Sequence, residues 1–234
     1  MKLYFLSMLG ALAVVAPGEA RAESNSNIAS IEQIGEGQLV AVDQEGASAT
    51  NRAEIGQKGT ENEARIDQSG SETANQASIA QDGTSNSASV SQSGTGTANQ
   101  ADVTQIGSEN SALILQQGAG GMNIASVLQQ GGGNQASISQ NHLGALMQQN
   151  SASIVQNGDG NSAEIDQQGT GHEVDMEQEG SNNTGKIDQS DENQKAVLKQ
   201  FGDNNSWNIE QSGAAGGITV EQYGPGGRIG IQQF

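Results

Sequence analysis

The chain has 234 residues, with 27 Asp and Glu against 9 Lys and Arg, and a formal net charge of −18. This acidic balance argues against a nucleic-acid partner, because phosphates are bound by basic side chains, and equally against an anionic membrane surface. Aromatic residues make up only 3% of the chain and cysteine is absent. A conventional globular core is therefore not expected, and order in so polar a chain has to come from repetition.

Residues 1–22 have the features of a secretory signal peptide. Lys2 supplies a positive charge, residues 3–16 (LYFLSMLGALAVVA) are apolar but too few to cross a bilayer, and Ala20-Arg21-Ala22 matches a small-residue cleavage site. The mature chain is then residues 23–234, outside the cytoplasm. A retained anchor is the alternative. No other segment resembles a membrane span, so we expect no membrane insertion.

One short repeat fills the mature chain, marked by a glutamine with an aliphatic residue or Met two positions before it. Positions −6, −4, −2 and 0 relative to this glutamine alternate with polar positions, which is strand periodicity. Position +2 is Gly in fifteen of the eighteen repeats, which predicts a turn there. The glutamines are Gln33, Gln44, Gln57, Gln68, Gln81, Gln92, Gln105, Gln116, Gln129, Gln140, Gln156, Gln167, Gln178, Gln189, Gln200, Gln211, Gln222 and Gln233.

The spacings of these glutamines predict the coil. Every step from an odd to an even repeat is 11 residues, whereas the steps between pairs are 13 four times, 16 once and 11 three times. One connection therefore has a fixed length and the other tolerates insertion. The predicted fold is all-β: a two-strand-per-coil, cross-β β-solenoid of about nine coils and eighteen strands, forming a single domain over residues 23–234. The 16-residue step predicts an insertion at residues 141–149, whose Leu143, Leu146 and Met147 either pack over the core edge or form an exposed contact.

The inward positions carry both the core and a set of amides. The −2 side chains are the core candidates, including Ile79, Val90, Val103, Ile114, Val127 and Ile138. Position −6 is Asn or Gln in fifteen repeats, and these residues are predicted, with the glutamines, to form hydrogen-bonded ladders that satisfy buried amides and template self-assembly. The asparagines assigned to these ladders include Asn51, Asn62, Asn75, Asn86, Asn99, Asn110, Asn123, Asn134, Asn150 and Asn161. A coil of amphipathic helices does not fit a spacing of two. Disorder of the monomer stays an alternative, because the core is thin.

The outward positions −3 and −1 carry many of the acidic residues, but between Gln81 and Gln156 no −1 residue is charged. These carboxylates either guard the flanks of an aggregation-prone middle or simply keep the face soluble. No nucleophile–base arrangement is present, so we expect neither an enzyme nor a cofactor. His142 and His172 have no cysteine or third histidine nearby, which argues against a zinc site, and His172 is expected to fill an Asn position.

The two ends of the array show no capping elements, which a monomeric solenoid needs to cover its open strand edges. The same repeat runs from Asn27 to Phe234. The top of one molecule is thus expected to pair with the bottom of another, a head-to-tail contact that does not close and gives a fibre.

Two segments, QQGGGNQASISQ (129–140) and QNGDGNSAEIDQ (156–167), reproduce the pattern Q-x-G-x-G-N-x-A-x3-Q. The chain resembles the curlin family through this pattern over essentially its whole mature length. The resemblance implies a secreted subunit of curli-type functional amyloid, extracellular cell-surface fibres of the biofilm matrix that serve cohesion and adhesion. It further implies a nucleator subunit and an outer-membrane export apparatus as partners, and it maps the family's Gln and Asn rungs onto the residues named above.

Three departures from the family pattern affect this interpretation. Asn begins both strands of a coil where the family often has Ser, eighteen repeats exceed the usual number, and only ESNSN (23–27) precedes the first repeat. These features leave open the export route and whether the chain is a bulk subunit or a nucleator. The alternative function is a monomeric β-solenoid adhesin or ligand-binding module, which would favour a regular outward array.

Overall fold

The computed structural model describes residues 27–45, 50–70, 74–95, 98–143, 148–213 and 215–234. The predicted signal peptide lies outside these residues. So do residues 144–147 of the predicted insertion, and with them Leu146 and Met147; the side chain of Leu143 is not described either. Within the described residues, no helix is long and apolar enough to span a bilayer.

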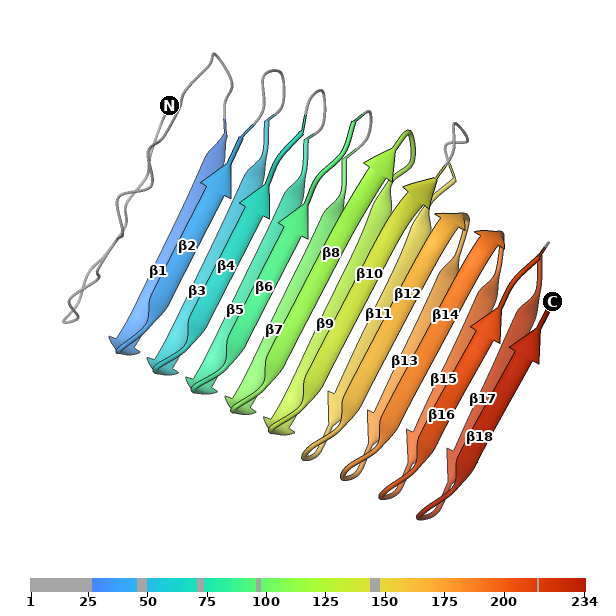
Figure 1. Ribbon diagram of the computed structural model, residues 1–234. Coiled ribbons are helices and arrows are strands. Elements are labelled where there is room, and N and C mark those ends of the chain that lie inside the picture. Colours follow the sequence, from blue (N-terminus) through green and yellow to red (C-terminus); the bar gives the residue numbers. More distant parts are fainter. Residues whose placement is uncertain (1–26, 46–49, 71–73, 96–97, 144–147, 214) are drawn as a thin grey trace.

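The described residues form eighteen β-strands in two nine-stranded sheets. Odd-numbered strands make one sheet, in the order β1 to β17, and even-numbered strands make the other, in the order β2 to β18 (Figure 1). The strands are β1 (Ile28–Glu36), β2 (Leu39–Gln44), β3 (Arg52–Thr60), β4 (Glu63–Gln68), β5 (Gln76–Thr84), β6 (Ser87–Gln92), β7 (Gln100–Ser108), β8 (Ser111–Ala119), β9 (Asn123–Gly132), β10 (Gln135–Leu143), β11 (Asn150–Asn157), β12 (Ser162–Thr170), β13 (Glu173–Glu179), β14 (Thr184–Glu192), β15 (Lys195–Phe201), β16 (Ser206–Gln211), β17 (Gly217–Tyr223) and β18 (Arg228–Gln233).

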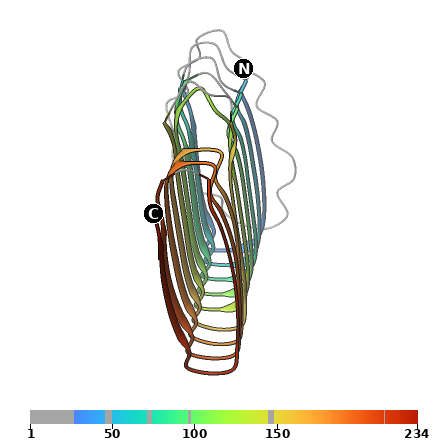
Figure 2. The same cartoon turned by 90° about the vertical axis from the view of Figure 1, so that its right-hand side faces the viewer.

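All pairings between these strands are parallel and in register. Gln81 in β5 lies beside Gln105 in β7, and each neighbouring position of the repeat is matched in the same way. Viewed along the axis, the coils superpose as narrow, flattened loops (Figure 2). The predicted two-strand-per-coil β-solenoid is confirmed, and the nine strands of each sheet agree with about nine coils.

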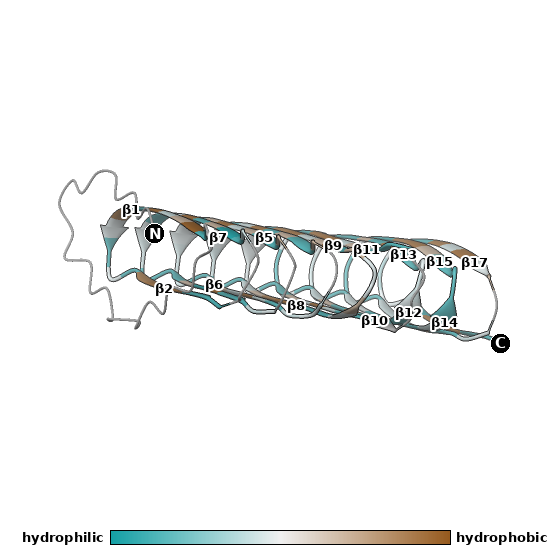
Figure 3. Ribbon diagram, turned by 90° about the horizontal axis from the view of Figure 1, so that it is seen from above, coloured by the Kyte–Doolittle hydropathy of each residue, from teal (hydrophilic) through white to brown (hydrophobic). Residues whose placement is uncertain are grey.

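The core is a thin layer between the two sheets, which lie face to face along the whole solenoid (Figure 3). It consists of the −4 and −2 side chains, mostly Ala and Ile or Val, which are almost fully buried in the inner coils. The core residues predicted from the sequence, Ile79, Val90, Val103, Ile114, Val127 and Ile138, are all part of it. Burying one such side chain contributes about 1.5–3 kcal/mol.

The tight connection owes its fixed length to two special backbone positions. Near the end of β7, Gly107 has φ of 119°, and in the turn that follows, Glu109 has φ of 58°. The second value is the left-handed region, which non-glycine residues rarely adopt, and Ser85 and Glu61 repeat it in the coils before. The amide of Glu109 donates to the carbonyl of Thr84 at 3.0 Å, so each turn is hydrogen-bonded to the turn of the neighbouring coil. An inserted residue in any of these turns would break its hydrogen bond to the neighbouring turn.

Gly107 gives a direct test of the stacked turn. A Cβ at this position would lie 2.0 Å from the carbonyl oxygen of Gly131, so Gly107→Ala should lower the free energy of unfolding by at least about 2 kcal/mol through overlap and strain. Gly56→Ala is the matched control, since its Cβ meets nothing within 4 Å. The urea midpoint of the β-sheet circular dichroism signal measures both. Equal midpoints for the two variants would contradict the stacked-turn account.

Candidate functional site

The glutamines form one continuous ladder in each sheet. In the odd-numbered sheet, Gln81 Nε2 donates to Gln105 Oε1, and Gln105 Nε2 donates to Gln129 Oε1, both at 2.8 Å. These bonds run from Gln33 through Gln57, Gln81, Gln105, Gln129, Gln156 and Gln178 to Gln200. The ladder of the even-numbered sheet runs from Gln44 through Gln68, Gln92, Gln116, Gln140, Gln167, Gln189 and Gln211 to Gln233.

Most inner glutamines also join the two sheets. The second N–H of Gln105 donates to the carbonyl of Ser87 in the opposite sheet at 3.0 Å, and Gln116 does the same to Gln100 at 2.8 Å. The carboxamide therefore uses both N–H groups and its oxygen, although the side chain is fully buried. Complete pairing removes the penalty for burying an amide.

The asparagines form a second pair of ladders that run in the opposite direction. Asn99 Nδ2 donates to Asn75 Oδ1 at 3.2 Å, back toward the N-terminal neighbour, and the backbone N–H of Asn99 donates to the same oxygen at 3.1 Å. Most of these Oδ1 atoms therefore satisfy the backbone amide at the start of the next strand of their sheet. Comparable bonds join Asn51, Asn62, Asn75, Asn86, Asn99, Asn110, Asn123, Asn134, Asn150 and Asn161 to their neighbours.

The two histidines take positions of the repeat. His172 fills the −6 position of β13, where its backbone N–H donates to Asn150 Oδ1 at 3.1 Å. Burial lowers the pKa of His172, against the opposing effect of the backbone carbonyls of Gln168 and Asp191. His142 replaces the +2 glycine, with Nδ1 3.1 Å from the Ala119 carbonyl and Nε2 3.0 Å from the Gln148 carbonyl. Among the described residues, no group of three or more His, Asp or Glu side chains is arranged to hold a metal ion.

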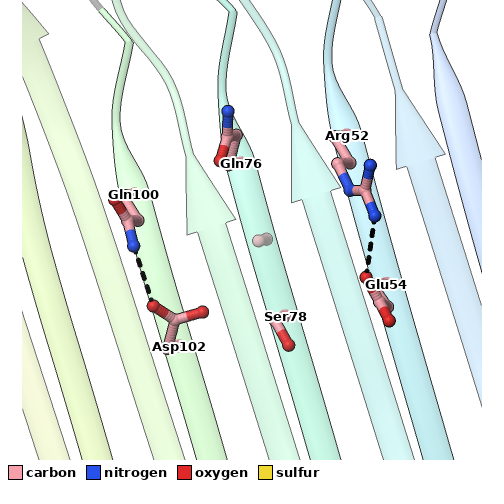
Figure 4. A pocket seen from close by; sticks show the side chains of 7 residues that line it. Arg52, Glu54, Gln76, Ser78, Gln100 and Asp102 are labelled. Carbon is pink, nitrogen blue, oxygen red and sulfur yellow. Dashed lines mark hydrogen bonds and ion pairs between the residues drawn. The ribbon is translucent and has the colours of Figure 1, made fainter.

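The outer face of the odd-numbered sheet has only shallow hollows. One, of about 240 Å³, lies between the Arg52–Glu54 ion pair (3.1 Å) and the Gln100–Asp102 hydrogen bond (3.0 Å), with Ser78 between them (Figure 4). A second, of about 390 Å³, lies over the small residues Gly56 and Ala80. The residues that line these hollows change from coil to coil, so they present no regular array to a ligand.

Both ends of the solenoid leave the core incompletely covered in the described residues. β1 pairs only with β3, and β17 only with β15. The core side chains of the end strands, among them Val40, Ile218 and Ile231, are only partly buried. Five of the eight exposed large hydrophobic residues in the described chain lie at the two ends: Ile28, Ile34, Leu39, Tyr223 and Phe234. Each end is thus an open section through the same core and ladders that hold the inner coils together.

The comparison with protein families agrees with this repeat geometry. The model of the curlin associated repeat matches residues 96–127, 149–180 and 180–213. The chain belongs to the curlin family. A search of the curated proteins returned no match. The matched segments contain rungs of both Gln ladders, among them Gln105, Gln116, Gln156 and Gln167.

The sequence alone did not reveal three features of the site. These are the opposite directions of the Gln and Asn ladders, the role of Asn Oδ1 as acceptor for a backbone amide, and the position of Trp207. Trp207 occupies a −4 position where most coils have Ala, and its Nε1 donates to Gln222 Oε1. No Gln200–Gln222 rung forms in its presence. The one available signal was that Trp207 and its in-register neighbour Gly185 both depart from the Ala pattern.

A row of carboxylates lies on the even-numbered sheet. Asp188 lies in register between Asp166 and Glu210. Burial raises the pKa of Asp188, and repulsion from Asp166 and Glu164 adds to this effect, while Lys186 opposes it. The folded state therefore disfavours the Asp188 carboxylate relative to the unfolded chain.

Asp188→Asn should accordingly stabilise the solenoid at pH 7. Because the folded pKa is raised, the stability gained from protonation is fully present below the ordinary Asp pKa of about 3.9 and is lost as the pH rises through the raised value. The variant should show a higher urea midpoint than wild type at pH 7 and a similar midpoint at pH 3. Asp102→Asn is the control, since its in-register neighbours Ser78 and Ser126 are uncharged. A lower midpoint for Asp188→Asn at pH 7 would refute the account.

Removing one glutamine from a ladder should show how much the ladder contributes to the free energy of unfolding. Gln105→Leu leaves Gln81 Nε2 without its acceptor and Gln129 Oε1 without its donor, both buried, and should cost about 2–4 kcal/mol of unfolding free energy. Gln100→Leu changes an exposed glutamine of the same strand and should cost less than about 0.5 kcal/mol. Urea denaturation compares the two. If both variants unfold at the wild-type midpoint, the ladder is not a main source of stability.

Proposed function

We propose that this chain is a secreted structural subunit that self-assembles head to tail into extracellular, curli-like amyloid fibres at the cell surface. The fibres would serve as biofilm matrix and in cohesion and adhesion, and the role is structural rather than catalytic. The observation that carries the proposal is that each end of the solenoid presents open strands, a partly buried core and, in the even-numbered sheet, a Gln ladder of the kind that neighbouring coils use to bind one another.

The chemistry of the two ends is complementary. At the N-terminal end, the first rung of each Gln ladder donates to the next coil, as Gln44 Nε2 does to Gln68 Oε1, which leaves the Gln44 oxygen directed to an incoming neighbour. At the C-terminal end, Gln233 Oε1 accepts from Gln211, which leaves the Gln233 N–H groups for the next copy. A second molecule placed in register would continue both sheets and this ladder.

The energetic balance also favours stacking. The partly buried core residues of the end coils would become as enclosed as those of the inner coils, and burial of apolar area contributes about 25 cal/mol per Å². The free edges of β1, β2, β17 and β18 would gain backbone partners, and uncovered edges of this kind promote association. Because the contact joins unlike ends, it propagates without closing.

Support for partners other than a second copy of the chain comes from the curlin family alone. Membership of the curlin family supports a nucleator subunit and an outer-membrane export apparatus. The signal peptide proposed at residues 1–22 supports export from the cytoplasm. The irregular outer faces give no comparable support to a monomeric adhesin or ligand-binding module.

The decisive experiment is to leave the purified mature chain at neutral pH and follow thioflavin fluorescence, electron microscopy and fibre diffraction. We expect unbranched fibres with a meridional reflection near 4.8 Å and an equatorial reflection near 10 Å, the strand and sheet spacings of cross-β structure. A monomer that stays soluble for days, without the meridional reflection, would reject the fibre subunit and favour the binding module.

A further inference from the structure

We infer that the junction between successive copies in the fibre is the weakest coil-to-coil step, because the last coil has no carboxamide at either −6 position. This inference rests on the proposed function and concerns the contact between β17–β18 of one copy and β1–β2 of the next. Gly216 and Gly227 stand where inner coils carry Asn, Gln or, once, His172. The Asn ladder of the even-numbered sheet therefore stops at Asn205, one coil before the solenoid does. The ladder of the odd-numbered sheet stops earlier, at Asn150, which His172 and Gln194 follow.

In the even-numbered sheet, the last coil donates a hydrogen bond to the Asn ladder but offers no acceptor to a following coil. The backbone N–H of Gly227 donates to Asn205 Oδ1 at 2.9 Å, as an inner −6 residue does. Gly227 has no side-chain oxygen to accept the corresponding N–H of a following coil. Gly216 has the same deficit in the other sheet, and Gln194 Oε1 in the coil before it is buried without a partner.

The amides of the last coil occupy the space left by these glycines. A Cβ on Gly216 would lie 2.7 Å from Gln233 Nε2, and a Cβ on Gly227 would meet Gln222 Nε2. Gln222 is held there by the hydrogen bond that Trp207 Nε1 donates to its oxygen. Neither glycine has a positive φ, and the atoms in the way are the ends of flexible side chains, so asparagine can be accommodated at both positions.

An in-register stack places Gln222 beside the next copy's Gln33 and Gln233 beside its Gln44. The backbone sheets and the Gln233-to-Gln44 rung continue across this junction. The backbone N–H groups of Asn27 and Gln38 instead face glycine, whereas the equivalent N–H of Asn51 donates to Asn27 Oδ1 at 3.1 Å inside the molecule. Each junction thus lacks both side-chain acceptors at the −6 positions, whereas even the inner steps that lack one of them keep the other, as at Asn51, Asn205 and Gly227. Each missing bond weakens the contact.

Fibre breakage measures the junction specifically, since each copy is covalently continuous and the fibre can part only between copies. Gly216→Asn combined with Gly227→Asn restores both acceptors. Fibres of this double variant should fragment about tenfold more slowly under identical sonication than wild-type fibres, measured as the growth of fibre-end number by electron microscopy.

The matched control is Gly217→Asn combined with Gly230→Asn, which adds the same two carboxamides to the same coil. Both control positions face outward and a Cβ on either meets nothing within 4 Å. The control should fragment like wild type. Equal fragmentation rates for the double variant, the control and the wild type would overturn the inference, while leaving the fibre proposal intact.

Hydrogen exchange in wild-type fibres gives a second test that needs no variant. The amides of Asn27 and Gln38 should exchange many-fold faster than those of Asn51 and Asn86, which donate to Asn27 Oδ1 and Asn62 Oδ1 within the molecule. Equal protection of all four would show that the junction supplies acceptors and would overturn the inference. A wild-type chain that forms no fibres at all would instead reject the proposed function, and this inference with it.

Discussion

The fold depends on one constraint: a buried carboxamide is tolerated only where an identical neighbour pairs with it. Gln105 is fully buried, yet its amide is satisfied by Gln81, Gln129 and the Ser87 carbonyl. An isolated coil would leave all these groups without partners. The stability of each coil is therefore supplied by the coils beside it, and parallel in-register stacking is the arrangement in which every position meets its own type.

The ladders also give the coil a direction. Gln side chains donate toward the C-terminal neighbour and Asn side chains donate toward the N-terminal neighbour. The dipoles of the two ladders in one sheet therefore oppose each other along the axis, so nine coils do not accumulate a large side-chain dipole. A coil added in the reverse orientation would set donors against donors. The polarity of the backbone strands and the polarity of the side chains thus require the same orientation.

Much of this architecture was predictable because it depends on spacing. The invariant 11-residue step and the period-two alternation around Gln105 and Gln116 predicted the paired strands, the two sheets and the inward residues, and the structure confirms that fold. Spacing says which side chains face inward, but not how they bond. A carboxamide carries donor and acceptor on one group of nearly symmetrical shape, so the direction of each ladder depends on side-chain rotamers. For the same reason, the sequence did not predict that Asn Oδ1 accepts a backbone N–H.

The residues that depart from the repeat change the side-chain volume at inward positions, and several of them lie near the C-terminal end. Trp207 takes the place of an alanine next to Gly185 in register, and the missing Cβ of Gly185 leaves room for the Met176 side chain of the opposite sheet. The indole then takes the oxygen of Gln222, and the displaced amide fills the site beside Gly227. The side chains of the last coil are therefore arranged differently from those of the inner coils. In the proposed fibre, this end would bind its neighbour with fewer amide hydrogen bonds than an inner coil does. A perfectly periodic chain would have junctions indistinguishable from its interior. Here the departures distinguish them, and the boundary between copies would persist as a physical property of the proposed fibre.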